Sequence, residues 1–480
     1  MSGRFISTGV EGLDAVLGGG FPRDSLIILA GNPGTGKTVF SAQFLYRGAV
    51  DYNEKGLYVS FAESRETFFE NMRGFGFDFE KLQRDGKFRF LDLLTVKEQA
   101  VPSILSIILD EAGRAEAKRL VLDSFSALAQ TFKEPIDIRI VVHAILSKII
   151  RMMGCTTIMV EEVPFGSSKI GFGVEEFVAD GVIHLRNREL GGYRFRELEI
   201  LKLRGARLKE SRLVFTLDGG FKAFPPFQFR LPEKPKRFQP IPDPSDKYST
   251  GSKSFDKVLN GGLPRGSVML LELDEKISTS MYHLLVAPMA ANFVLQGRGV
   301  FVVPSSGVDP ALFRKYIGVY GGTEEEWTHS ARIIMTTMEG RAEPPAHYSN
   351  VIHVKGEDWR DDMSKVLRAS EELATQTGQP NLSIVGVDTL VTLYGEKRCE
   401  EILNLSATMA RTAGSSVIAI VKAGLSSLAV KLSPIADIYL RLTRKRGSPL
   451  LYGVKPRTGL YAVELDTSEG YPIPKLTPII

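Results

Sequence analysis

The stretch of the sequence with the clearest chemical content is AGNPGTGKTVF, residues 30–40. It fits the phosphate-loop pattern G-x-x-x-x-G-K-[ST] in full and lies between an apolar run and a helix-like run. Glycines let backbone N–H groups converge on phosphate oxygens, the lysine adds positive charge, and the following helix points its positive end at the anion. The residues expected to bind the phosphates are Gly31, Asn32, Pro33, Gly34, Thr35, Gly36, Lys37, Thr38 and Val39.

Carboxylates at the ends of other apolar runs could complete this site. Asp123 ends RLVLD and is expected, together with Thr38, to hold Mg²⁺, although an Asp in this position can also cap a helix. Glu63 ends GLYVSFAE, where parallel strands present ligands, and is the group expected to orient or deprotonate water. Glu161 and Glu162 end another run and are alternatives for positioning water or sensing the nucleotide. The sequence therefore predicts ATP and Mg²⁺ as cofactors.

Strand-like and helix-like segments alternate around these residues. The apolar runs SLIILA, GLYVSFAE, KFRFLDLL, RLVLDS and CTTIMVEE are separated by stretches with helical periodicity, such as VPSILSIILDEA and IRIVVHAILSKIIRMM. Continuous apolar strands separated by helices predict an α/β fold with a mainly parallel sheet covered on both faces. The runs GVIHLR, YRFRELEILKL and SRLVFTL then predict antiparallel strands added to one edge.

The chain contains an internal duplication. STGVEGLDAVLGGGFPRDSLIIL, from Ser7, returns as STGSKSFDKVLNGGLPRGSVMLL, from Ser249, with identities at a constant offset. A repeat this long implies two tandem globular copies rather than a solenoid. We expect an ATPase domain over residues 1–220, a Pro-rich extended linker over 221–247, and a second domain over 248–480.

The second copy lacks the phosphate loop. Asp274 to Ser280 replace most of it, with Thr279 at the place of Lys37, and the acidic residues would repel phosphate. Ser306 takes the place of Glu63 in the aligned sequences. Asp388 aligns with Asp123, although an Asp after a buried strand is more often a helix cap than a metal ligand. We therefore expect a degenerate domain that neither binds ATP in the usual way nor hydrolyses it.

Together, these residues resemble the KaiC-like branch of the RecA and RadA superfamily, tandem-domain ATPases related to the cyanobacterial clock protein. The resemblance rests on STGVEGLDAVLGGGFPRDSLIILAGNPGTGKT, FAES, LVLDSFSALAQ, EEFVADGVIHLR and LEILKLRGARL, and its repeat spans both halves. It implies RecA-like domains assembled into a homo-oligomeric ring, usually a hexamer, with nucleotides at subunit interfaces.

The resemblance also assigns catalytic roles across the interface. Lys202-Leu203-Arg204 matches a K-x-R element that reaches the neighbour's γ-phosphate, so Lys202 and Arg204 join Lys37 and Glu63 as expected catalytic residues. Taken from composition alone, both would be surface charges. The second copy keeps this element as Lys455-Pro456-Arg457. One departure is Ala62, where the family often has a second glutamate, and this predicts slow hydrolysis.

Composition narrows the setting. The 480 residues are 43% hydrophobic and 24% charged, without a run long enough to span a membrane, and two cysteines in different halves fit a reducing cytoplasm. A net charge of +4 gives no strong field that would favour nucleic acid.

The leading functional prediction is a cytoplasmic, ring-forming ATPase whose first domain is catalytic and whose second is structural or binds a regulatory partner. One alternative is a RadA-like recombination ATPase, for which the DNA-binding loop would be VPFGSSKIGFGVEEF with Phe165, Lys169 and Phe172. Another is a scaffold that binds ATP without appreciable turnover, which Ala62 keeps open.

Overall fold

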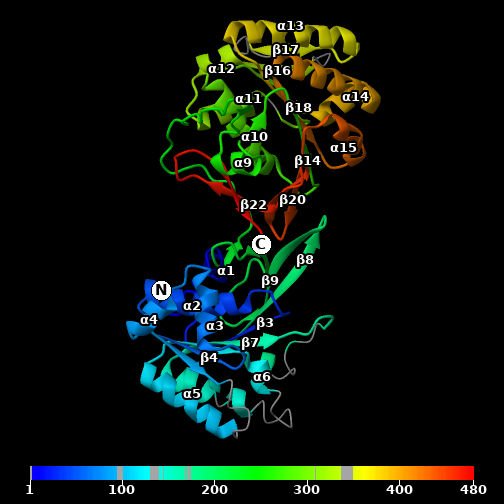
Figure 1. Cartoon of the computed structure of the whole chain (residues 1–480). Coiled ribbons are helices and arrows are strands. Elements are labelled where there is room, and N and C mark those ends of the chain that lie inside the picture. Colours follow the sequence, from blue (N-terminus) through cyan, green and yellow to red (C-terminus); the bar gives the residue numbers. More distant parts are fainter. Residues whose placement is uncertain are drawn as a thin grey trace. The chain divides into compact units, whose positions relative to one another are not determined.

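The computed structural model describes residues 3–93, 101–129, 140–143, 145–167, 170, 175–308, 310–336 and 350–480. The chain divides into two compact units, each with its own sheet (Figure 1). The first unit comprises Met1–Pro226 with Pro478–Ile480, and the second comprises Phe227–Thr477. No helix in the described part of the chain is long and apolar enough to cross a membrane.

The first unit is built on a nine-stranded sheet in the order β11-β10-β9-β8-β3-β7-β6-β4-β5. The strands from β8 to β5 pair in parallel, whereas β8, β9, β10 and β11 pair antiparallel. Their bounds are β3 Leu26–Gly31, β4 Gly56–Ser60, β5 Phe88–Asp92, β6 Arg119–Asp123, β7 Thr156–Glu162, β8 Gly181–Leu190, β9 Tyr193–Leu203, β10 Arg212–Thr216 and β11 Lys222–Phe224. A separate pair joins β1, Phe5–Ile6, to β2, Phe21–Pro22.

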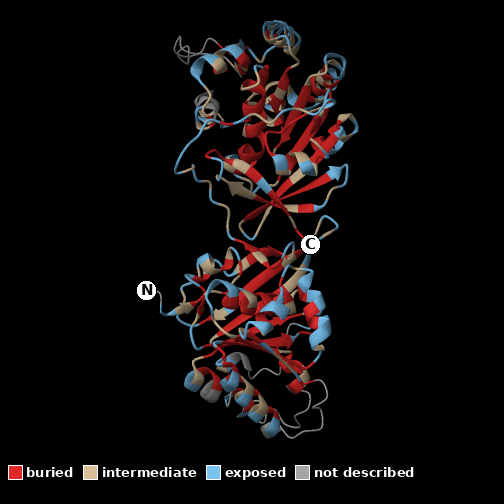
Figure 2. Cartoon of the chain, turned by 60° about the vertical axis from the view of Figure 1, so that its left-hand side comes forward, coloured by how far each residue is buried: buried red, intermediate tan, exposed pale blue. Residues whose placement is uncertain are grey.

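Helices cover both faces of this sheet because the strands are apolar on both sides. Ile27 and Leu29 of β3 face a core shared with α2 and α3, while Leu26 and Ile28 face a core shared with α5. Figure 2 shows the strands as mostly buried. The helices are α1 Leu13–Leu17, α2 Lys37–Asp51, α3 Arg65–Arg73, α4 Phe79–Arg84, α5 Val101–Ala115, α6 Phe125–Ala129, the π-helix η1 Ile145–Met152 and α8 Glu175–Val178.

The second unit repeats this plan in a ten-stranded sheet, ordered β17-β16-β15-β18-β19-β14-β20-β21-β22-β23. Its strands pair in parallel from β17 to β20, and β20, β21 and β22 pair antiparallel. Their bounds are β14 Val268–Leu273, β15 Val300–Val303, β16 Ala331–Thr336, β17 Val351–Val354, β18 Leu382–Gly386, β19 Ser416–Val421, β20 Ile438–Lys445, β21 Ser448–Lys455, β22 Leu460–Asp466 and β23 Ile473–Pro478. The strands β12 Lys247–Tyr248 and β13 Leu263–Pro264 form a small separate sheet.

Helices also lie on both faces of the second sheet. Residues of α9, α10 and α12 pack in one core, and residues of α13, α14 and α15 pack on the other face. The helices are α9 Lys253–Val258, α10 Thr279–Val294, α11 Pro310–Val319, α12 Glu324–Ser330, α13 Trp359–Thr377, α14 Val387–Ala413, α15 Ser426–Leu432 and the short 3₁₀ helix η2 Ser433–Ile435. The predicted fold class, a mainly parallel sheet flanked by helices with an antiparallel edge, is confirmed.

The duplicated sequence has a structural role in both units. Ser7 Oγ donates to Asp14 Oδ2 at 2.6 Å, and the Thr8 hydroxyl donates to Asp14 Oδ1 at 2.6 Å. Ser249 and Thr250 make the equivalent bonds to Asp256, each at 2.6 Å. Because these bonds fix the segment that leads into the first helix of each unit, the repeated Ser, Thr and Asp residues stabilise the fold.

The segment expected as a linker, 221–247, is divided between the two units. Residues 222–224 form β11 at the edge of the first sheet. Within the second unit, Phe238 is 1% exposed and its N–H donates to Tyr320 O at 2.9 Å. The prolines keep this chain extended, and its aromatic and charged side chains attach much of it to a folded unit.

Candidate active site

The phosphate-loop residues connect β3 to α2 at the carboxyl end of the parallel strands. Gly34 and Gly36 have φ values of 74° and 98°, which glycine adopts without the strain of a side chain. A Cβ on Gly31 would lie 2.6 Å from Thr35 Oγ1 and 2.7 Å from Leu185 O. Asn32 connects the loop to the residue that follows β7, because its Nδ2 donates to Val163 O at 2.8 Å. The glycines are thus required by backbone shape, and the loop forms a close-packed cradle.

Lys37 begins α2 and points back over the loop. Its Nζ donates to Gly31 O at 2.8 Å and to Asn32 O at 3.0 Å, although only 8% of the residue is exposed. Burial lowers the pKa of Lys37, and the negative charges of Glu162 and Asp123 oppose that shift. A buried ammonium beside these carbonyls is a cation placed to meet phosphate oxygens.

Thr38 and Asp123 meet beside the loop. Thr38 Oγ1 donates to Asp123 Oδ2 at 2.9 Å, and the hydroxyl of Tyr58 donates to the same oxygen at 2.5 Å. Burial raises the pKa of Asp123, while both hydrogen bonds and the charge of Lys37 act to lower it. One hydroxyl and one carboxylate form a small oxygen donor set of the kind that Mg²⁺ uses when phosphates and water supply its other ligands.

Glu63 lies just after β4 on the same edge. Its N–H donates to Ser60 Oγ at 3.0 Å, and its Oε1 accepts from Asn71 Nδ2 at 2.5 Å. Burial raises the pKa of Glu63, the hydrogen bond from Asn71 opposes the rise, and the charge of Asp123 adds to it. A carboxylate with a raised pKa, held by a side-chain amide, is suited to accept a proton from water.

The two glutamates that end β7 face different surroundings. Glu161 is fully buried and its Oε2 accepts from Ser126 Oγ at 2.7 Å, while the N–H of Glu162 donates to Ser126 Oγ at 2.8 Å. Ser126 therefore fixes the end of β7 against the start of α6. The Glu162 carboxylate is exposed and acts electrostatically on Lys37, so of the pair it is the one presented to the loop.

Lys202 and Arg204 lie near the amino-terminal ends of the parallel strands, whereas the phosphate loop lies at their carboxyl ends. Arg204 Nη1 approaches Asp180 Oδ1 at 3.5 Å, and Asp180 Oδ2 accepts from the N–H of Leu26, the first residue of β3. The loop begins at Gly31, the last of the six residues of β3, so about 17 Å of strand separates the two ends. Within one subunit, the K-x-R element is therefore remote from the site it would serve.

Three residues near the loop were not predicted from the sequence. Tyr58 lies inside the buried strand β4, and its only signal was that a buried phenol requires a hydrogen-bond acceptor. Ser126 shows no pattern beyond its place in LDSFSAL. Arg196, on β9, donates from Nη1 to Gly34 O at 2.9 Å, a contact that follows only from the hairpin's path.

The second unit places different residues at the equivalent edge. Ile28 pairs with Met159 and Leu270 pairs with Ala419, which aligns β7 with β19. Leu122 pairs with Met159, and Val385 with Ala419, so the next residue, Gly386, stands at the place of Asp123.

The alignment of Asp388 with Asp123 is therefore wrong, because Asp388 lies two residues further on, in the first turn of α14. A Cβ at Gly386 would lie 2.5 Å from Ser305 Cα, so this position has no room for a carboxylate.

The same pairing gives a reversal of charge. Gly31 pairs with Glu162 in the first unit, and the equivalent residue in the second unit is Lys422, directly after β19. Lys422 Nζ lies 3.0 Å from Asp388 Oδ2 and donates to Ser306 O at 2.8 Å. An internal ammonium thus occupies the edge where the first unit gathers carboxylates.

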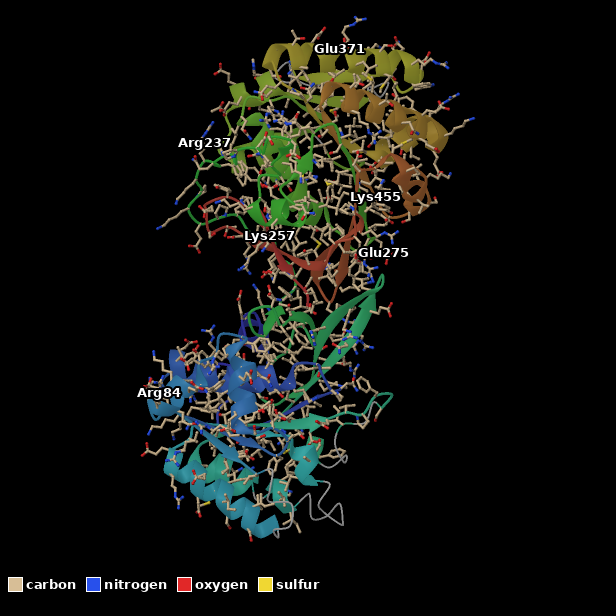
Figure 3. All side chains as sticks on the ribbon, in the orientation of Figure 1. Arg84, Arg237, Lys257, Glu275, Glu371 and Lys455 are labelled. Carbon is tan, nitrogen blue, oxygen red and sulfur yellow. The ribbon has the colours of Figure 1, made fainter. Side chains whose placement is uncertain are left out.

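Hydrogen bonds to Asp274 hold the corresponding segment of the second unit in place. Asp274 accepts from the hydroxyl of Thr443 at 2.7 Å and from the N–H of Lys276 at 3.0 Å. Glu275, labelled in Figure 3, is exposed in the same loop. α10 then begins at Thr279, which has no positive charge to offer an anion. The segment is therefore ordered by local hydrogen bonds although it lacks the phosphate-binding groups of the first unit.

Comparison with known proteins identifies the family. The family described as KaiC ATPase matches residues 6–221, and a family described as GvpD basic region 2 matches residues 237–330. The UPF0273 protein of Methanocaldococcus jannaschii is 34% identical over 229 residues, which are 44% of this chain and 92% of that protein. The chain belongs to the KaiC-like ATPase family.

Other relatives show how much of each chain the similarity covers. The circadian clock oscillator protein KaiC of Thermostichus vulcanus is 33% identical over 273 residues, covering 55% of this chain and 51% of that protein. This KaiC-like chain thus spans about half the length of the clock proteins it matches. The crystal structure of a KaiC-like protein from Pyrococcus horikoshii matches with 36% identity and a TM-score of 0.42, covering 46% of this chain and 99% of that one.

The loop considered for DNA binding is described only in part. Phe165 is 77% exposed, whereas Lys169 and Phe172 lie outside the described residues. No group of three or more His, Cys, Asp or Glu side chains in the described residues could hold a metal ion by itself. A metal at Thr38 and Asp123 therefore requires ligands from a bound nucleotide and water.

Proposed function

We propose that the first unit binds ATP with Mg²⁺ and hydrolyses it slowly. The observation that carries this proposal is the convergence of Lys37, Thr38 and Asp123 at the glycine cradle, with Glu63 on the same sheet edge. The residues fit the group because the cradle has no room for a Cβ at Gly31 and offers a buried cation beside an oxygen donor pair.

Each residue has a distinct role in this proposal. The backbone from Gly31 to Val39 binds the phosphate chain, and Lys37 neutralises the oxygens on which charge develops. Thr38 and Asp123 hold Mg²⁺, which when bound supplies charge neutralisation along the phosphates. Glu63 orients water and accepts its proton, and without a second carboxylate at Ala62 the step is slow.

Lys202 and Arg204 act on the site of a neighbouring subunit. Their place at the sheet edge opposite the loop prevents action on their own site, and a ring of subunits brings that edge to the next subunit's nucleotide. We therefore propose a homo-oligomer, as the family resemblance implies, with a hexamer as the expected ring. Hydrolysis then depends on assembly.

The second unit serves as a structural or partner-binding platform in a regulatory, cytoplasmic ATPase. Gly386 and the Lys422–Asp388 ion pair support this assignment, because they replace the metal ligand and oppose a bound cation. Binding of nucleic acid is not part of the proposal.

The decisive experiment measures ATP turnover and bound nucleotide per chain on the purified protein, with its mass in solution recorded with and without Mg-ATP. One nucleotide per chain, slow turnover and a multi-subunit particle are expected. Binding without turnover would favour the scaffold function that Ala62 permits. Two nucleotides per chain, or full activity as a monomer, would contradict the roles given to the second unit and to Lys202.

A further inference from the structure

The second unit contains a partly open cavity that its sequence did not reveal. It lies between the sheet face formed by β15, β16 and β18 and the covering helices α13 and α14, which Figure 1 shows at the same end of the unit. Its volume is about 430 Å³, within the range of sites that bury a small organic molecule. Glu371, labelled on α13 in Figure 3, is at its rim.

The cavity interrupts what is a continuous core in the first unit. There, one apolar cluster joins β3, β4 and β6 to α5 and η1. On the corresponding face of the second unit, the buried side chains form two clusters, one around α14 and α15 and one around Phe301, Ile334 and Leu373. Because protein interiors are normally close-packed, a gap of this size between two clusters is unusual and makes the cavity a candidate ligand site.

The wall of the cavity is mainly apolar. Phe301, Val303 and Val385 contribute from the strands, and Val366 and Leu403 contribute from the helices. Small side chains, among them Ser383 on β18, leave the space open. The volume of about 430 Å³ is of the size that holds a small molecule rather than a polypeptide segment.

Asp362 and Tyr394 form a polar pair within this wall, which also contains other polar side chains such as Asn381 and Thr389. The hydroxyl of Tyr394 donates to Asp362 Oδ2 at 3.0 Å and so connects α14 to α13. Asp362 is 2% exposed, and it also accepts the N–H groups of Lys355 at 3.0 Å and Gly356 at 2.8 Å. Lys365 is the cation near this carboxylate, at 3.9 Å.

The hydrogen-bonding capacity of Asp362 indicates which kind of ligand the cavity can bind. A carboxylate has about four acceptor positions, and three are used by Tyr394 and the two N–H groups, so one position is available for a donor. A ligand hydroxyl can use it, whereas a ligand carboxylate would place a second negative charge beside Asp362.

The helix that carries Tyr394 is broken at the next residue. Gly395 has φ 78° and ψ 163°, which separates α14 into two helical segments. Among the described residues, and apart from the neighbouring backbone of the helix itself, no atom lies within 4 Å of a Cβ placed there, so close packing does not impose the break. Tyr394 therefore ends the first helical segment of α14, where it lines the cavity.

We propose that this cavity binds a neutral, largely apolar small molecule whose hydroxyl group donates to Asp362. This gives the second unit a ligand of its own, chemically unrelated to a nucleotide.

The test uses the full chain and the uncharged fluorophore N-phenylnaphthylamine as the probe. Its fluorescence should rise on binding, and decanol should displace it. Decanoate should compete about tenfold less well, because its carboxylate meets Asp362. Absence of a fluorescence rise, or equal competition by the alcohol and the carboxylate, would overturn the proposal without any variant being needed.

Two matched variants locate the probe. Ser383→Phe fills the cavity and should reduce probe affinity about tenfold, whereas Ser364→Phe adds the same side chain on the exposed side of α13 and should leave it unchanged. Circular dichroism and ATP turnover confirm that both variants fold. Equal probe binding by a folded Ser383→Phe protein and the wild-type protein would show that the probe binds elsewhere.

Discussion

The two units share a framework and differ at one edge of it. Both order their parallel strands in the same way, with one additional parallel strand, β17, in the second unit, and both have the same Ser-Thr-Asp hydrogen bonds at their start. At the carboxyl edge, the first unit has Lys37, and the second has Thr279 at the start of the equivalent helix. The difference shows that the fold depends on many apolar positions, each contributing part of the burial energy, whereas the site depends on a few polar residues.

The charges at the carboxyl ends of the parallel strands support the proposal that the second unit does not bind nucleotide. In the first unit, Asp123 and Glu162 act on a single buried ammonium, and the balance leaves room for an external cation and a polyphosphate. In the second unit, Lys422 pairs directly with Asp388, so the edge is neutralised from within the chain. Magnesium would have to displace a tethered cation.

The largest expected effect is at Lys37. Lys37→Ala should lower ATP turnover to about one-hundredth or less, because the phosphate charge loses its buried cation. Thr279→Ala, at the equivalent helix start, should leave turnover and nucleotide stoichiometry unchanged. The measurement is steady-state phosphate release together with bound nucleotide per chain. A loss of nucleotide in Thr279→Ala would mean that the second unit has a live site.

Glu63→Gln should reduce turnover by about 100-fold while nucleotide binding persists, since the amide still accepts hydrogen bonds but takes no proton. The raised pKa of Glu63 adds a pH signature. Only the ionised carboxylate accepts a proton, so turnover should fall as pH drops through its pKa, starting at a higher pH than for an ordinary glutamate. Unchanged turnover in Glu63→Gln would remove the residue from this role.

Mixing two inactive proteins tests whether Lys202 acts on the nucleotide site of a neighbouring subunit. Lys202→Ala keeps the loop, and Lys37→Ala keeps the K-x-R element, so a mixed ring contains interfaces with both parts intact. Turnover of the mixture should exceed that of either protein alone. Lys455→Ala, the equivalent change in the second unit by the pairing of Tyr439 with Lys455, is the matched control and should remain active unmixed. Failure of the mixture to recover activity would contradict action across the interface.

Tyr58 tests the support of the metal ligand. Tyr58→Phe removes one of two hydrogen bonds to Asp123 Oδ2 without changing the shape of the core, and it should lower turnover about tenfold. The deficit should shrink as Mg²⁺ concentration rises, because the bond orients the carboxylate that is proposed to bind the metal. A deficit that is independent of Mg²⁺ would show that Tyr58 acts only through packing.

The parallel sheet, its covering helices and the phosphate loop could be predicted from the sequence because each depends on residues that are close together in the chain. Apolar runs and their spacing predict the parallel sheet and its helices, and the phosphate loop is a contiguous pattern from Gly31 to Thr38. Contacts between residues that are distant in the sequence could not be predicted from it. Tyr58 reaches Asp123, and Arg196 reaches Gly34, only because the strands bring them together.

The error at Asp388 has the same origin. Both apolar runs end near an Asp, so a sequence comparison without pairing partners places Asp388 at Asp123, although the strand register differs by two residues. The register also identifies Lys422 as the counterpart of Glu162, which no local pattern indicates. The cavity escaped prediction for a further reason, since a gap in packing depends on where helices settle and not on which residues they contain.

The smallest expected effect is at Lys422. Its substitution tests the charge difference between the two units most directly. Lys422→Met removes the ammonium that pairs with Asp388 while keeping the apolar stem, and it should lower the stability of the second unit by about 1 kcal/mol. Thermal unfolding measures the loss, expected as a shift of about 2–4 °C. Lys431→Met, whose exposed ion pair spans 3.7 Å, is the control and should change little. Because Gly386 supplies no carboxylate, Lys422→Met should acquire no Mg²⁺-dependent nucleotide binding. If it did, a single lysine rather than the lost ligands would keep the second site closed.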